Sequence, residues 1–180
     1  MGAFATLHFG MRYAHTRSNS RALSLTLAGC GTGSHPDVHE AFKKDSLALG
    51  ESLMAHGMQP ASESYCHGPT RLPFLRKNPR GHAEFLQQFC EHSSLGSGLT
   101  AIGYQGRRPS LYTLREDMAR IAVPTLILCG DEDEPCMDPS LMLKRTIPGS
   151  QLAFLPNSGH GINLEEPALF NQLLMDFLTS

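Results

Sequence analysis

The chain has 180 residues and no tryptophan, and no apolar run in it approaches the roughly 20 residues that a membrane-spanning helix needs. It also lacks an excess of charge of either sign. Fifteen lysines and arginines nearly balance 17 aspartates and glutamates, which gives a net charge of −2 with neutral histidines. Such a balance creates no field that would gather nucleic acid or an anionic membrane. We therefore expect neither as a partner, and a small molecule is the expected ligand.

Two further absences concern cofactors and compartment. The five cysteines are odd in number and scattered, which predicts reduced thiols and a cytoplasmic location. Cysteine and histidine come close together at Cys66-His67 and at Cys90 and His92, but without the spacing of a zinc site, so no metal is expected. No glycine-rich phosphate loop follows a strand, and no cofactor is expected either.

The most informative stretch is a short apolar run, Thr125 to Cys129, which lies between Pro124 and Gly130. Its length and its turn-forming neighbours predict a strand buried on both faces. Four carboxylates follow at once, at the end of a parallel strand where open α/β sheets place their sites. A second strand pattern, Gln151 to Leu155, precedes a loop that carries His160 between two glycines. The sequence thus sends an acid and a histidine from the carboxyl ends of two strands.

The remaining pattern predicts mostly helices. Helices are expected at residues 1–13, 36–57, 81–92, 111–121, 139–147 and 165–178, and one more strand at residues 21–30. Four prolines predict a loop-rich passage over residues 58–80, and glycines at 96, 98, 103 and 106 predict broken structure there. No strand is expected between Gly33 and Pro124. A mostly helical insertion between strands of one sheet would project over the strand ends as a cap.

These motifs, in this order, resemble the C-terminal part of the α/β-hydrolase family over essentially the whole chain. The matching motifs are G-x-x-D, here Gly130 to Asp133, and G-H-x-x-x-x-E-x-P, here Gly159 to Pro167. The first residues, Met1 to Ala5, are similar to those that follow the serine in a G-x-S-M-G nucleophile elbow. The resemblance implies an α/β fold with a partial sheet of about three parallel strands, flanking helices and a helical cap. The implied division is core at residues 1–34, cap at 35–115 and C-terminal core at 116–180.

The resemblance also implies the site. Asp133 matches the acid and His160 the base of a Ser-Asp-His triad, with Asp131 as the competing acid. Met1 matches the residue after the nucleophile, whose backbone N–H contributes to the oxyanion hole. The serine would precede Met1, so the chain by itself is expected to lack its nucleophile and to be inactive. The other candidate nucleophiles lie on no predicted elbow and are not expected to replace it; these are Ser158, Cys30 and Cys129.

The implied activity is hydrolysis of an ester, a lactone or a related bond in a small apolar substrate. The alternative is an inactive fragment or a non-catalytic module that binds a small molecule or a protein. Strands absent from the sheet would leave an exposed edge through which the chain could self-associate. Arg107 and Arg108 are either a solvated basic pair or a means of steering a substrate carboxylate. The sequence leaves the substrate open among esters, lactones, carbon–carbon bonds, halides and peroxides.

Overall fold

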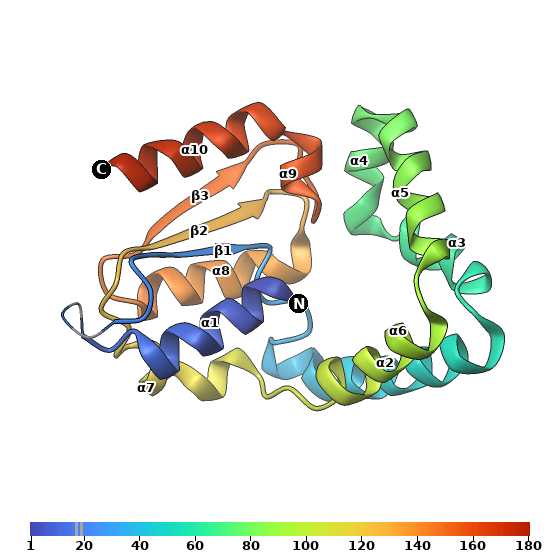
Figure 1. Ribbon diagram of the computed structural model, residues 1–180, viewed down its shortest axis with the longest axis horizontal. Coiled ribbons are helices and arrows are strands. Elements are labelled where there is room, and N and C mark those ends of the chain that lie inside the picture. Colours follow the sequence, from blue (N-terminus) through green and yellow to red (C-terminus); the bar gives the residue numbers. More distant parts are fainter. Residues whose placement is uncertain (17, 19) are drawn as a thin grey trace.

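The computed structural model describes residues 1–16, 18 and 20–180, and a parallel sheet in the order β1-β2-β3 organises it (Figure 1). The strands are β1 (Leu25–Ala28), β2 (Thr125–Gly130) and β3 (Gln151–Leu155). In the central register Leu27 pairs with Ile127, which pairs with Leu152. The predicted α/β class with about three parallel strands is confirmed.

Strand β1 is shorter than the predicted span of residues 21–30. Its pairing with β2 begins at Leu25 opposite Thr125, and the preceding Pro124 has no N–H to extend the ladder. Pro124 only accepts a hydrogen bond from the Leu25 N–H. Leu23 is 94% exposed, so the alternating apolar pattern predicted a strand that began too early in the sequence.

Strand β2 is buried along its whole length because helices cover both faces of the sheet. One face packs Ile127 against α1 (Gly2–Tyr13) and α8 (Glu134–Thr146). The other packs Leu126 and Leu128 against α10 (Pro167–Thr179). Figure 1 shows α10 on one side of the sheet and α1 and α8 on the other. These two layers hold the carboxyl ends of the strands at a common edge.

The helices around the sheet follow the sequence with shifted boundaries. Helix α1 matches the prediction, and its Gly10 lets the helix approach β1 so closely that a Cβ there would lie 2.4 Å from Leu25 Cδ1. Helix α8 starts five residues before the predicted Pro139, because Pro135 already occupies the first turn, where proline fits best. A short helix, α9 (Ile162–Glu165), precedes α10.

Residues between β1 and β2 form helices only, as predicted, but far more of them. They are α2 (Pro36–His56), α3 (Gln59–Cys66), η1 (Pro69–Arg71), α4 (Leu72–Lys77), α5 (Pro79–Glu91), α6 (Ser94–Thr100), η2 (Ala101–Gln105), η3 (Leu111–Leu114) and α7 (Arg115–Met118). The prediction of a loop-rich passage over residues 58–80 was wrong. Its four prolines each lie in the first turn of a helix, where a missing N–H costs nothing.

The glycines at 96, 98 and 103 lie inside helices and do not break them, whereas Gly106 follows the last residue of η2. Gly98 packs against Gly50 of α2, and a Cβ at either position would lie 2.7 Å from the other residue's carbonyl oxygen. These glycines therefore let α2 and α6 touch backbone to backbone. Across the described ranges, no helix is both long enough and apolar enough to cross a bilayer.

Candidate active site

Asp133 lies where β2 has ended and α8 begins. It occupies the N-cap position of α8, yet its side chain caps no backbone N–H of that helix. The carboxylate instead points toward the loop after β3. Asp133 is fully buried, and the N-terminus of α8 favours a negative charge at this position.

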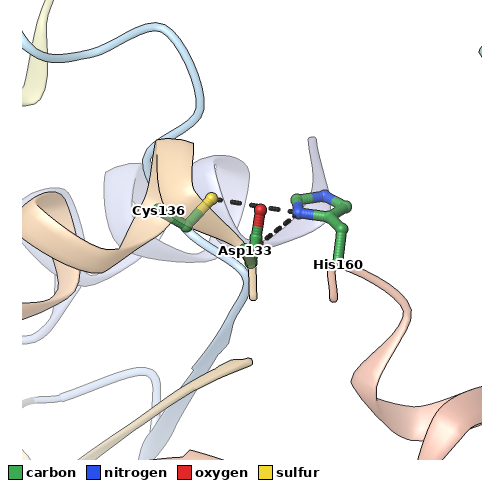
Figure 2. A group of neighbouring side chains, drawn as sticks. All are labelled: Asp133, Cys136 and His160. Carbon is green, nitrogen blue, oxygen red and sulfur yellow. Dashed lines mark hydrogen bonds and ion pairs between the residues drawn. The ribbon is translucent and has the colours of Figure 1, made fainter. Parts of the chain in front are cut away.

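His160 comes from the loop between β3 and α9 and completes the pair. Its Nδ1 lies 2.7 Å from Asp133 Oδ2, close enough for a hydrogen bond in which the ring N–H donates to the carboxylate. Figure 2 shows the two side chains converging from separate segments. A carboxylate in this place fixes the tautomer of the ring and leaves Nε2 as the reactive nitrogen.

Asp131, the competing acid, has another partner. Its Oδ1 accepts a hydrogen bond from the Ser158 N–H at 3.1 Å, so it holds the histidine loop by its backbone. Glu165 does the same from the other end, because its buried carboxylate accepts the N–H groups of Gly159 and Gly161 at 2.7 and 2.9 Å. Two carboxylates thus shape the loop, and the third contacts the imidazole.

Glycines make room for this arrangement. Gly29, at the end of β1, has a φ of +59°, and a Cβ there would lie 3.1 Å from His160 Cε1. Gly130 passes so close to the histidine loop that a Cβ would lie 2.1 Å from the Ser158 carbonyl oxygen. Within that loop Asn157 has a φ of 53°, a left-handed conformation that asparagine tolerates better than most residues. Only a locally unusual backbone brings the histidine to the acid.

Cys136 is a neighbour of the pair that the sequence did not single out (Figure 2). Its Sγ lies 3.8 Å from His160 Nδ1 and 3.2 Å from Thr32 Oγ1. Burial, then the charge of Asp133, raise the pKa of this thiol far above its ordinary value, so it stays protonated. In the described part of the chain, Asp133, Cys136 and His160 are the three residues whose potential ligand atoms lie together, whereas Cys66, His67, Cys90 and His92 form no such group.

A cavity of about 500 Å³ lies beside His160, and Met1 lines it as well. The Met1 carbonyl accepts a hydrogen bond from Tyr104 at 3.1 Å. Desolvation, and next Arg108, lower the pKa of the Met1 amine. The three residues assigned to the site by sequence therefore meet at one place: Asp133 and His160 in contact, and Met1 on the wall of the cavity that His160 faces.

The other candidate nucleophiles form no hydrogen bond with His160 Nε2. Ser158 is fully buried, and its hydroxyl bonds to the Pro156 carbonyl and receives Lys77 Nζ. Burial raises the pKa of both the Cys30 and the Cys129 thiols to about 12, so neither forms a thiolate near neutral pH. Among the described residues, no hydroxyl or thiol is hydrogen-bonded to His160 Nε2.

No protein-family model matches the chain, but individual relatives do. Over 97 residues it is 38% identical to the AB hydrolase superfamily protein YisY of Bacillus subtilis, which covers 53% of this chain and 34% of that protein. Over 72 residues it is 39% identical to the monoacylglycerol lipase ABHD6 of Bos taurus, covering 39% and 21%. The matches thus span about a third or less of the curated relatives' length.

Solved structures extend the likeness to the whole chain. MenH from S. aureus superposes with a TM-score of 0.85 at 20% identity, over 98% of this chain and 64% of that one. The enol-lactonase from Burkholderia xenovorans LB400 gives 0.77 at 19% identity, over 100% and 63%. The chain has the α/β-hydrolase fold, and parts of it are similar in sequence to members of that superfamily.

Several residues that shape the candidate site were not found from the sequence. The carboxyl of Glu165 was visible as part of a motif, but its two backbone bonds were not. Thr70, in the helical segment between β1 and β2, accepts the His160 N–H at 2.9 Å, and no local pattern marks it. Arg71, the next residue, lines the same cavity as His160. These contacts join segments distant in sequence, so single-sequence periodicity carries no signal for them.

Proposed function

We propose that this chain supplies the acid and the base for Ser-Asp-His hydrolysis of an ester, lactone or related bond. The observation that carries the proposal is the 2.7 Å contact of His160 Nδ1 with the buried carboxylate of Asp133. In such a site the histidine accepts the proton of the serine hydroxyl, and the acid stabilises the imidazolium that forms. A lipase among the curated relatives and an enol-lactonase among the structures support these bond types.

In this proposal the nucleophile is a serine that would precede Met1 in a longer chain. Support comes from Met1 and His160, which line one cavity, so a residue joined to Met1 would be near the imidazole. Further support comes from the matched structures, of which this chain covers just under two thirds. Joined to such a residue, Met1 would have an amide N–H, and we assign that group to the oxyanion hole.

The substrate in this proposal is small and largely apolar, and residues 35–115 act as its cap. A second cavity of about 530 Å³ adjoins the first and is lined largely by apolar side chains from this segment, among them Leu53, Met58, Phe85 and Phe89. The Thr70 carbonyl, also in this segment, holds the backbone of His160. Cap and core would thus enclose the substrate together.

An esterase assay tests the proposal. The 180-residue chain should hydrolyse p-nitrophenyl esters no faster than its His160→Ala variant, because the proposal places the nucleophile outside these residues. Sequencing upstream of the Met1 codon should find an in-frame G-x-S. The chain extended by that segment should hydrolyse the ester and lose the activity on His160→Ala. His160-dependent turnover by the 180-residue chain would contradict the lacking nucleophile, and an inactive extended chain would contradict the triad.

The second candidate is a non-catalytic binding module, and the two adjoining cavities favour it as a separate outcome. Binding without turnover in the extended chain would establish it. We also propose that the chain self-associates, because β1 pairs with β2 alone in the described sheet. A sedimentation mass that stays monomeric as the protein concentration rises would contradict this.

We also propose a cytoplasmic location, which fits the five cysteines that form no disulfides.

A further inference from the structure

The structure separates the two adjacent arginines that the sequence presents as a pair. Arg107 is exposed, whereas Arg108 is only 8% exposed and lines the cavity beside His160. The Arg108 guanidinium lies between two rings, 4.9 Å from the Phe4 centroid and 4.7 Å from that of Phe42. It also donates a hydrogen bond to the Thr32 carbonyl. Arg108 is therefore a charge built into the cavity wall.

This buried charge has no acidic counterpart in the described part of the chain. Arg108 forms no ion pair there, and the lining of the cavity includes neither aspartate nor glutamate. Desolvation lowers the pKa of the Arg108 side chain, which shows that burial opposes its charge. Ring faces and one carbonyl compensate part of that cost, but a buried cation is ordinarily paired with an anion. The wall thus carries a positive charge that an anion in the cavity would neutralise.

A second arginine reaches the same cavity from another element. Arg71, at the end of η1, lies over the rings of Tyr65 and Phe85 at 5.3 and 5.8 Å and donates to the Tyr65 hydroxyl at 3.1 Å. It too forms no ion pair among the described residues. Both arginines lower the pKa of the Met1 amine, so both act on one point of the cavity. Stacking on the rings fixes each guanidinium plane and reduces the entropy lost when an anion binds.

We propose that Arg71 and Arg108 form an anion subsite, and that the substrate carries a carboxylate at the end away from its apolar body. The inference rests on the proposed function for the reacting bond, since His160 lines the same cavity. The apolar body would extend into the adjoining cavity, which shares Met1, Leu49, Tyr65, Ala101 and Gln105 with this one. Two fixed guanidinium forks match a planar carboxylate better than a point charge would. The substrate class is therefore an ester or lactone that bears a free carboxylate.

Binding to the 180-residue chain tests this without catalysis. Octanoate and octanamide have the same length and nearly the same shape, and only the first is charged near neutral pH. Calorimetric titration should show octanoate binding at least tenfold more tightly than octanamide, and the ratio should fall as sodium chloride rises. Equal affinity, or no binding of either probe, would overturn the anion subsite. Neither result would touch the proposed triad, which the esterase assay of the extended chain measures separately.

Variants then locate the charge. Arg71→Gln should weaken octanoate binding about tenfold and leave octanamide unchanged, because one charge-assisted contact is lost. Arg108→Lys should keep the fold, since it retains a charge and a long apolar stem, yet lose affinity through the lost fork. Arg107→Gln removes the same charge from an exposed site and should bind octanoate like the parent chain. Losses in Arg107→Gln that equal those in Arg71→Gln would reduce the effect to net charge and overturn the proposal.

Discussion

The sheet with its flanking helices and the helical segment between β1 and β2 differ in what fills their interiors. In the described part of the chain, both clusters of buried apolar residues belong to the sheet, with α1, α8 and α10 around it and Leu111 and Met118 as contributions from the end of the other segment. The segment of residues 35–115 buries side chains such as Leu53 and Phe74 in neither cluster. Several of its apolar side chains line a cavity instead of a core.

Polar contacts also join the two regions beside the site. Where α4 meets the loops of the site, Arg76 pairs with Glu132, Lys77 pairs with Glu166, and the Thr70 carbonyl accepts the His160 N–H. Figure 1 shows α4 beside α9 at this junction. The acid and the histidine therefore lie at the end of an apolar core, whereas ion pairs and hydrogen bonds connect α4 to the loops of the site.

Truncating one leucine in each region should show the largest contrast. Leu128→Ala removes a fully buried side chain of β2 and should lower the free energy of unfolding by about 3 kcal/mol. Leu53→Ala in α2 removes a side chain that already borders a cavity, so about 2 kcal/mol should be lost. Urea titration measures both. Leu23→Ala, at a 94% exposed position, is the control and should change nothing. Equal losses for Leu128 and Leu53 would contradict the contrast.

Alkaline pH should affect the core through its buried thiols. Burial raises the pKa of Cys30 to about 12 from an ordinary 9.0. The folded chain then keeps a proton that the unfolded chain releases, so this contribution is complete below pH 9 and is lost as pH rises toward 12. Raising the pH from 8 to 10 should therefore lower the free energy of unfolding by about 1.4 kcal/mol through this thiol. Urea titrations at both pH values should show that this decrease is smaller by the same amount in Cys30→Ala than in the parent chain.

The sequence also predicted the sheet region more accurately than the helical segment between β1 and β2. The strands, Asp133 and His160 were predictable because a short buried run and a following turn are local patterns. Residues 35–115 were predicted as mostly helical, but the helices over residues 58–80 and around Gly96, Gly98 and Gly103 were missed, because the effect of proline and glycine depends on their position in a helix. Pro60 and Pro79 begin helices, and Gly98 makes a helix crossing tighter.

The parts of the site that were not predicted are those that depend on folding. Nothing local indicates that Cys136 would lie against His160, or that Arg108 would turn into the cavity while Arg107 faces solvent. Each of these placements results from contacts between segments that are far apart in the sequence, and such contacts leave no periodic pattern in it.

A glycine at the edge of the core tests how tightly the site is built. Gly29→Ala places a methyl group 3.1 Å from His160 Cε1 on a backbone with a φ of +59°. Gly149→Ala imposes the same backbone strain at a φ of +66°, with nothing within 4 Å of the new methyl group. Each should lose about 1 kcal/mol of unfolding free energy from backbone strain. Only Gly29→Ala should shift the NMR resonance of the His160 Nδ1 proton. Equal shifts in both variants would show that the new methyl group does not press on the imidazole ring.

The smallest effect should come from weakening the contact between α4 and the loops of the site. Lys77→Ala removes contacts with Glu166 Oε1 and with Ser158 Oγ, the latter at 3.1 Å, from a side chain that is 20% exposed. The loss should be about 0.5 to 1 kcal/mol, and it should appear as faster hydrogen exchange in α4 because the core does not depend on this contact. Arg80→Ala breaks the exposed pair with Glu84 inside α5 and should leave exchange in α4 unchanged. Raising the salt concentration should reproduce the Lys77→Ala pattern in the parent chain. If exchange in β2 accelerates as much as in α4, the two regions open as one unit and the contrast between them fails.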